Sequence, residues 1–135
     1  EFNKRHNMAR SDVKKIKSAE DVFNLLSERL KDEMQEKFIV LALNSKNGIV
    51  GEEIISKGNL DNVTVQPREV FKSAIKNSAS KIVLVHNHPS GDQNPSGADI
   101  NITERLIEAG NILGIAVQDH VIIGAGKWWS WRESS

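Results

Sequence analysis

Cysteine is absent from the 135 residues, so neither a disulfide nor a thiolate metal site can stabilise this fold. Tyrosine is also absent, and only three prolines interrupt the chain. No apolar run is long enough to cross a bilayer, and no signal-peptide core is visible near the start. We therefore expect one cytoplasmic domain with an ordinary hydrophobic core and no membrane partner.

An excess of charge of either sign is also lacking, because 18 basic residues balance 18 acidic ones. The distribution is uneven: residues 1–17 contain six basic and two acidic residues, which leaves residues 18–135 with a net charge of −4. A domain of that sign lacks the broad basic surface of a nucleic-acid binder. We interpret residues 1–17 as a basic tail or linker, the part able to contact nucleic acid, and residues 18–135 as the domain.

The most informative stretch reads KIVLVHNHPSGDQNPSGAD. Its apolar run, Ile82–Val85, predicts a strand that is buried on both faces. His86 and His88 follow two positions apart, so they point to the same side of an extended chain. After a loop rich in proline and glycine, Ser96 is a suitable N-cap for a helix, and Asp99 lies in its first turn.

Two imidazoles and a carboxylate meeting where a strand ends and a helix begins suit a divalent transition metal, most simply zinc with an open fourth position. Each residue also has a structural explanation: Asp99 as a helix N-terminal acid, Ser96 as its cap, and the histidines as polar residues closing a strand. A zinc deaminase is excluded because it requires cysteine ligands. The letters His86-Asn87-His88 suggest a metal nuclease by name only, since no basic groove is predicted.

Apolar periodicity and turn signals predict alternating helices and strands along the rest of the chain. Ser18 caps the first helix with Asp21 at its third position, and Asn47-Gly48 predicts a hairpin. The expected helices cover Ala19–Met34, a segment beginning at Pro67, and Gly97–Gly110; the expected strands cover Phe38–Leu43, Ile49–Ile55, Val63–Val65, Ile82–Val85, and Ile115–Val117 with Val121–Ile123, as two strands or one bent strand. We therefore predict a three-layer α/β domain, a mixed β-sheet flanked by helices.

Buried helix faces and caps follow from the same patterns. Gly110 is expected to end the third helix. The side chains expected to face the core are Val70, Phe71, Ala74 and Ile75 in the second helix and Ile100, Thr103, Leu106 and Ile107 in the third. Trp128, Trp129 and Trp131 are expected on an edge strand, where they could also form a protein-binding patch.

The string HNHPSGD…PS…D, with QEKF upstream, PREVFKSAI between and DHVIIG downstream, is similar to the bacterial RadC family. Its His-x-His…Asp core resembles the metal signature of the JAMM (JAB1/MPN+) metalloproteases, and the resemblance extends over Ser18–Trp131. It implies a JAB/MPN, cytidine deaminase-like architecture. RadC-like proteins usually carry a preceding helix-hairpin-helix region that is not visible here, so we expect an isolated C-terminal domain or a short relative.

The resemblance also implies roles for particular residues. His86, His88 and Asp99 would ligate Zn²⁺, Glu36 would be the general base, and Ser96 would hydrogen-bond the oxyanion. Glu52 and Glu53 are rivals for the role of the base. Asp92 is a rival ligand, Asn87 is expected to shape the turn or support the site, and Asp119-His120 is expected to be structural rather than to contact substrate.

The implied activity is that of a zinc-dependent metallopeptidase cleaving a peptide or isopeptide bond in a protein substrate through a metal-activated water. One alternative is a non-catalytic or quiescent zinc-containing interaction module in a DNA-repair or DNA-processing context. A nuclease is a third hypothesis. The sequence leaves the substrate and the oligomeric state open.

Overall fold

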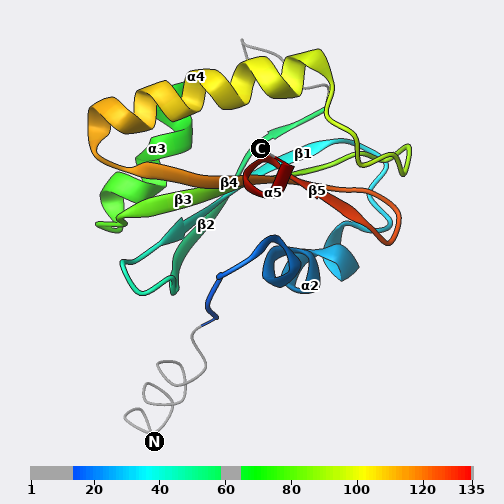
Figure 1. Ribbon diagram of the computed structural model, residues 1–135, viewed down its shortest axis with the longest axis horizontal. Helices are drawn as coiled ribbons and strands as arrows, with labels where there is room; N and C mark the ends of the chain where they lie inside the picture. Colours follow the sequence, from blue (N-terminus) through cyan, green and yellow to red (C-terminus); the bar gives the residue numbers. More distant parts are fainter. Residues whose placement is uncertain (1–13, 59–64, 135) are drawn as a thin grey trace, which may run out of the picture.

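The computed structural model describes residues 14–58 and 65–134 (Figure 1). Along the chain these form α2 (Ala19–Leu30), β1 (Lys37–Leu43), β2 (Ile49–Lys57), α3 (Pro67–Lys76), β3 (Lys81–Asn87), α4 (Gly97–Leu113), β4 (Ala116–Ile123), β5 (Trp128–Ser130) and α5 (Trp131–Ser134). The five-stranded sheet has the order β2-β1-β3-β4-β5, in which only the β3–β4 pair is parallel. Figure 1 shows α3 and α4 over one face and α2 over the other, which confirms the predicted three-layer mixed architecture.

The sheet separates two apolar clusters, and the central strand β3 contributes to both. Its side chains alternate, as the pleat requires. Ile82 and Leu84 pack in the cluster on the α3–α4 face, whereas Val83 and Val85 pack in the cluster on the α2 face. At the end of the strand, His86 therefore points to the α4 side and Asn87 to the α2 side.

Helix α2 begins as predicted, with the Ser18 hydroxyl accepting a hydrogen bond from the Asp21 N–H at 3.3 Å. It ends at Leu30, four residues before the predicted end at Met34. Leu30 is the last buried residue of the apolar stripe, and Met34 is 91% exposed, so no packing supports a further turn. The fold also begins before the predicted boundary at Ser18, because Ile16 is buried against the α2 face of the sheet.

Helix α4 continues past the predicted cap at Gly110 and ends at Leu113, and its C-terminal cap is Gly114, whose φ of 75° is left-handed. Gly110 instead allows close packing, since a Cβ there would clash with the Ile115 carbonyl oxygen. Two apolar positions were also assigned to the wrong face: Ile75 and Ile100 are 59% and 38% exposed.

Replacing Gly110 with alanine is expected to destabilise the protein by about 1–3 kcal/mol, because overpacking against a backbone atom outweighs alanine's higher helix propensity. The free energy of unfolding from denaturant titration measures this effect. Gly97→Ala is the matched control, since a Cβ at Gly97 meets no atom within 4 Å. Equal stability of the two variants would contradict the packing role.

Two remaining predictions concern a strand before α3 and the strands at the C-terminal edge of the sheet. Residues 63 and 64 of the strand expected at Val63–Val65 lie outside the described residues. β4 is one strand across both segments predicted for it. β5 places Trp128 and Trp129 at the sheet edge, as expected, and Trp128 packs on Phe23; the prediction was wrong for Trp131, which is the first residue of α5.

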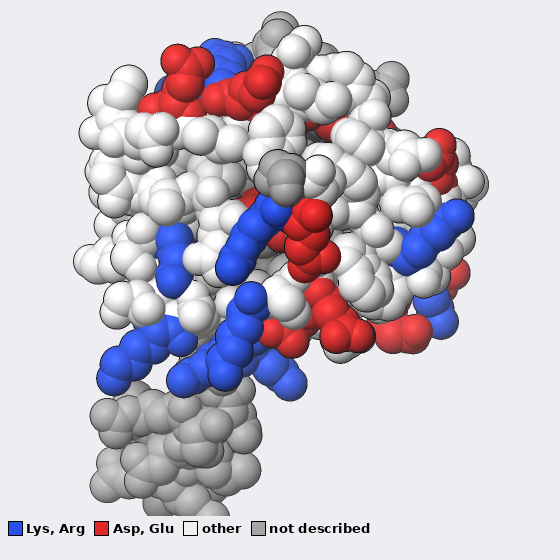
Figure 2. Space-filling model, viewed as in Figure 1, with Lys and Arg blue, Asp and Glu red and all other residues white. Residues whose placement is uncertain are grey.

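Charged side chains of both signs are interspersed over the face seen in Figure 2, and Lys and Arg gather at its lower end. Lys14, Lys15 and Lys17, among the first described residues, are exposed. On this face, basic and acidic side chains therefore alternate above the basic lower end. Within the described part of the chain, no helix combines the length and apolar character needed to span a bilayer.

Candidate metal centre

The two histidines leave the buried strand β3 and converge, as their spacing predicted. Their ring centroids lie 4.9 Å apart, with the rings almost perpendicular. His86 is the penultimate residue of β3, and His88 follows the strand, where its backbone N–H donates to the Ile123 carbonyl at 2.9 Å. The parallel β3–β4 pair therefore fixes the backbone that carries both imidazoles.

Asp99 is the third residue of α4, and its buried carboxylate faces both imidazoles. Oδ1 lies 3.2 Å from His86 Nδ1, and Oδ2 lies 3.1 Å from His88 Nε2. Oδ2 also accepts a 2.8 Å hydrogen bond from the Ser96 N–H, while Ser96 Oγ accepts one from the Asp99 N–H, which completes a capping box. The structural roles predicted for Asp99 and Ser96 are therefore both present, and the same Asp99 carboxylate faces the two imidazoles.

These contacts determine the charge of the Asp99 carboxyl group. Burial raises its pKa, but the close contact with His86 and the hydrogen bonds to His88 and the Ser96 N–H outweigh burial and hold the pKa well below the usual range. Asp99 is therefore an anion. The same contact with Asp99 raises the pKa of His88.

Glu36 reaches the site from the segment between α2 and β1. Its Oε1 lies 3.5 Å from His86 Nε2, and among the described residues Glu36, His86 and His88 form a group whose donor atoms all lie within 4.8 Å of one another. The structure places the rival glutamates elsewhere: Glu52 and Glu53 lie on β2, and Glu52 pairs with Arg29 of α2. The compact donor group thus contains Glu36, with Asp99 adjoining it through both histidines.

Several buried atoms in this centre have no hydrogen-bond partner. Both ring nitrogens of His86 and Oδ1 of Asp99 are in this state: Nδ1 and Oδ1 lie 3.2 Å apart, but their orientation does not make a hydrogen bond. Unpaired buried polar atoms cost free energy unless something satisfies them, and imidazole with carboxylate is a donor set that transition metals bind. The residues present therefore fit a divalent metal ion.

The orientation of His88 depends on a main-chain atom that no sequence motif identifies. His88 Nδ1 lies 2.8 Å from the Asp92 carbonyl oxygen, and when it donates there Nε2 is left as the nitrogen facing Asp99. The Asp92 carboxylate itself accepts from the Asn94 N–H in the loop. Asp92 thus lies outside the compact donor group.

A buried pair, Thr103 and His120, lies behind the centre. Thr103 Oγ1 donates to the Asp99 carbonyl at 2.7 Å and lies within hydrogen-bond distance of His120 Nδ1. Burial lowers the pKa of His120 to about 3, and the nearby His86 adds to the effect. Thr103 lies four residues after Asp99, one helical turn away. The sequence predicted only that it faces the core.

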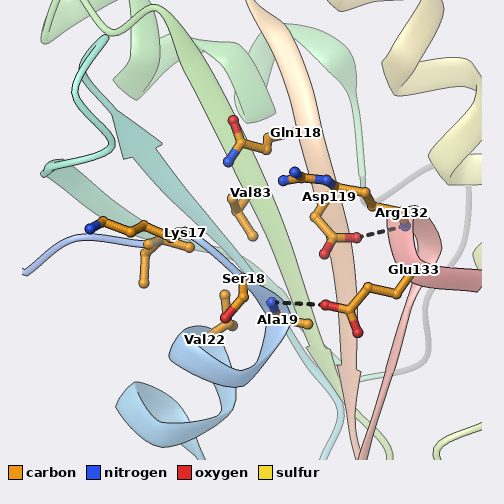
Figure 3. Close-up of a pocket in the computed structure, with 10 residues that line it drawn as sticks. Lys17, Ser18, Ala19, Val22, Val83, Gln118, Asp119, Arg132 and Glu133 are labelled. Carbon is orange, nitrogen blue, oxygen red and sulfur yellow. Dashed lines mark hydrogen bonds between the residues drawn. The ribbon is translucent and has the colours of Figure 1, made fainter.

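Asp119 has the structural role expected for it and lies in the middle of β4, opposite Val83 of β3. Its carboxylate accepts hydrogen bonds from the His120 N–H, the Ser130 hydroxyl and the Arg132 N–H. It borders a cavity of about 160 Å³ where α2 meets α5, and Figure 3 shows Glu133 reaching across to the Ala19 N–H. This cavity is lined by groups that anchor the C-terminal segment.

The donor group opens onto a cleft of about 570 Å³. Its lining residues are Met34, Gln35, Glu36, Gly58, His88, Pro89, Ser90 and Ser96. Glu36, His88 and Ser96 therefore lie on one accessible surface, with His86 and Asp99 buried behind them.

A family profile and several related proteins match most of this chain. The profile of the family described as the RadC-like JAB domain matches residues 16–135. A UPF0758 protein of Alkaliphilus oremlandii is 57% identical over 119 residues, which cover 88% of this chain and 51% of that protein. UPF0758 proteins of Chlorobium chlorochromatii and Methanosarcina mazei are each 48% identical, over 98% and 89% of this chain and 60% and 52% of their own lengths. The chain thus spans only about half to three fifths of these relatives.

Proposed function

This chain belongs to the RadC-like JAB domain family, and on that premise we propose that it is a zinc-dependent metallopeptidase cleaving a peptide or isopeptide bond. The observation that carries the proposal is the placement of Glu36 beside His86 and His88, at the mouth of an open cleft. A purely structural zinc site is closed and needs no carboxylate at the mouth of an open cleft. The substrate we propose is a protein, and the compartment is the cytoplasm.

His86, His88 and Asp99 would hold the ion, since they supply two imidazole nitrogens and a carboxylate held as an anion. When bound, zinc supplies a Lewis acid that lowers the pKa of a water molecule and polarises the substrate carbonyl group. Neutral residues in place of Asp99 would leave the two imidazoles without the anion that they now face. The chain therefore provides both the charge and the geometry for a dication.

Glu36 would act as the general base and then the general acid. Its half-buried carboxylate takes a proton from the attacking water and passes it to the nitrogen of the leaving amine. This transfer requires a carboxylate that is accessible from the cleft and close to the ligands. Glu36 meets both conditions, whereas Glu52 is occupied by Arg29 on the α2 side of the sheet.

Ser96 would stabilise the oxyanion. Its Oγ accepts from the Asp99 N–H, so the hydroxyl proton is available to donate into the cleft. A donor aimed at a developing oxyanion contributes strongly because it needs no reorganisation during the reaction. The helix cap thus places a donor beside the ligands.

The proposal is tested by loading the chain with zinc and screening peptide and isopeptide-linked protein substrates. We expect hydrolysis that a chelator abolishes and added zinc restores. Binding of zinc without hydrolysis of either substrate class would favour the non-catalytic interaction module. Metal-dependent nicking of DNA that is lost in His86→Ala would instead favour a nuclease.

Ser96→Ala is expected to lower turnover about a hundredfold and to cost about 1 kcal/mol of stability, since it removes an oxyanion donor and an N-cap together. Ser18→Ala is a matched control, because Ser18 caps α2 through the same contact to an aspartate three residues on. It should lose similar stability and keep full turnover. Equal turnover of the two variants would contradict the role of Ser96 in stabilising the oxyanion.

A further inference from the structure

The side chain of Asn87, between the two histidines, is buried on the other face of the sheet. Alternation along β3 directs His86 toward α4 and Asn87 toward α2. Asn87 is 3% exposed, which is unusual for an asparagine. A buried amide requires hydrogen-bond partners, and both ends of this one have them.

The Asn87 amide binds the main chain on both sides of Glu36. Its Oδ1 accepts a 2.6 Å hydrogen bond from the Lys37 N–H, and its Nδ2 donates to the Gln35 carbonyl at 3.1 Å. The carbonyl of Glu36 itself accepts from the Gly58 N–H at 2.7 Å. The peptide groups before and after the Glu36 side chain are therefore fixed by contacts from two other segments.

This bridge lies where the regular pairing of β1 with β3 ends. Phe38 is paired with His86, so Lys37 and Asn87 occupy the next positions. At these positions the Lys37 N–H donates to the Asn87 side chain instead of to the main chain of β3. An amide side chain supplies a donor and an acceptor on two separate atoms without charge, which suits two main-chain partners on either side of Glu36. Aspartate would retain the acceptor alone, and an aliphatic residue would retain neither.

We propose that Asn87 is a positioning residue that holds the Glu36 carboxylate beside His86 and His88 at the metal. The inference rests on the proposed metal function of this site. The HNH triplet then acts as one unit, in which two residues present imidazoles on one face and the third, on the opposite face, orients the carboxylate that completes the donor group. Direct metal ligation by Asn87 does not compete with this role, since both amide ends are engaged on the α2 face.

The inference is tested by a double-mutant cycle on zinc affinity, measured by competition with a chelator, with Zn²⁺ alone as the probe. Asn87→Ala is expected to weaken zinc binding about tenfold, the scale found for partners that orient metal ligands. Glu36→Gln should weaken it by a similar factor. In the Glu36→Gln background, Asn87→Ala should add almost nothing, because the carboxylate that it positions is already gone.

Asn77→Ala is the matched control, since Asn77 also donates from Nδ2 to a backbone carbonyl, that of Ser73 at the end of α3. It should leave zinc affinity unchanged in both backgrounds. Asn87→Asp, a second variant that keeps the Lys37 contact, guards against a folding defect. The negative charge added by Asn87→Asp would by itself increase zinc affinity. A loss of zinc affinity in this variant therefore reports the lost contact with the Gln35 carbonyl.

Equal loss from Asn87→Ala in both backgrounds would overturn the inference, because the residue would then act on the fold rather than through Glu36. Unchanged affinity in Asn87→Ala and Asn87→Asp would overturn it as well. Failure of the unsubstituted chain to bind zinc would overturn both this inference and the proposed function. If the unsubstituted chain binds zinc but Asn87→Ala and Glu36→Gln show no coupling, this inference fails and the proposed function does not.

Discussion

His88→Ala is expected to reduce bound zinc from about one ion per chain to almost none. Removing this imidazole takes away a donor and leaves the Asp99 carboxylate, an anion, without the contact at Oδ2 to His88. His86→Ala should have the same effect, since His86 lies between Glu36 and Asp99. Elemental analysis of protein purified without chelators and reloaded with zinc measures the stoichiometry.

Two aspartates in the same segment make the measurement specific. Asp99→Asn removes a charge that faces both imidazoles, so it should also lower the zinc content. Asp92→Asn removes an equal charge from the loop but leaves the Asp92 carbonyl oxygen that orients His88, so it should retain zinc. Full zinc content in His88→Ala or Asp99→Asn would contradict the ligand assignment, and loss in Asp92→Asn would point to the loop instead.

Local sequence patterns were sufficient for the elements that converge on this site. A four-residue apolar run gave β3, the spacing of His86 and His88 gave their common side, and Ser96 with Asp99 gave the start of α4. Each of these features depends on residues close together in the chain. The resemblance to a known family added Glu36, which lies 50 residues before His86 and which no local pattern connects to it.

The features that the sequence did not reveal depend on how the backbone packs once the chain is folded. Gly110 resembled a helix end because glycine suits a cap, yet its role is to admit the backbone of Ile115. The end of α2 depended on where sheet contact stops rather than on a terminating residue. The orientation of His88 comes from a carbonyl oxygen, and every residue has one. Such contacts become visible only when the chain is folded.

Asn87 illustrates the same limit within the best motif of the chain. The sequence places it between two histidines, which suggests a role in the turn or in support of the site. Its partners are main-chain atoms about 50 residues away, on both sides of Glu36. A motif therefore identifies which residues share a face, whereas the residue on the opposite face is understood only through the neighbouring strand.

Glu36→Gln is expected to lower hydrolysis roughly a thousandfold while the chain still binds one zinc at saturating metal. Glutamine preserves the size and hydrogen-bonding capacity of the side chain but cannot take a proton from water at neutral pH. His86, His88 and Asp99 remain to hold the ion, so zinc affinity should fall but the number of zinc ions bound at saturation should not. Zinc content and hydrolysis rate measured on the same preparation separate these two effects.

Glu52→Gln is the control for this prediction, because it removes a carboxylate that pairs with Arg29 on the α2 side of the sheet. Its hydrolysis rate should match that of the unsubstituted chain. A Glu36→Gln variant that still turned over would transfer the role of the base to another group, with Glu53 the next to substitute. A variant that lost zinc even at saturating metal would identify Glu36 as a ligand that the site requires, and the base would then lie elsewhere in the cleft.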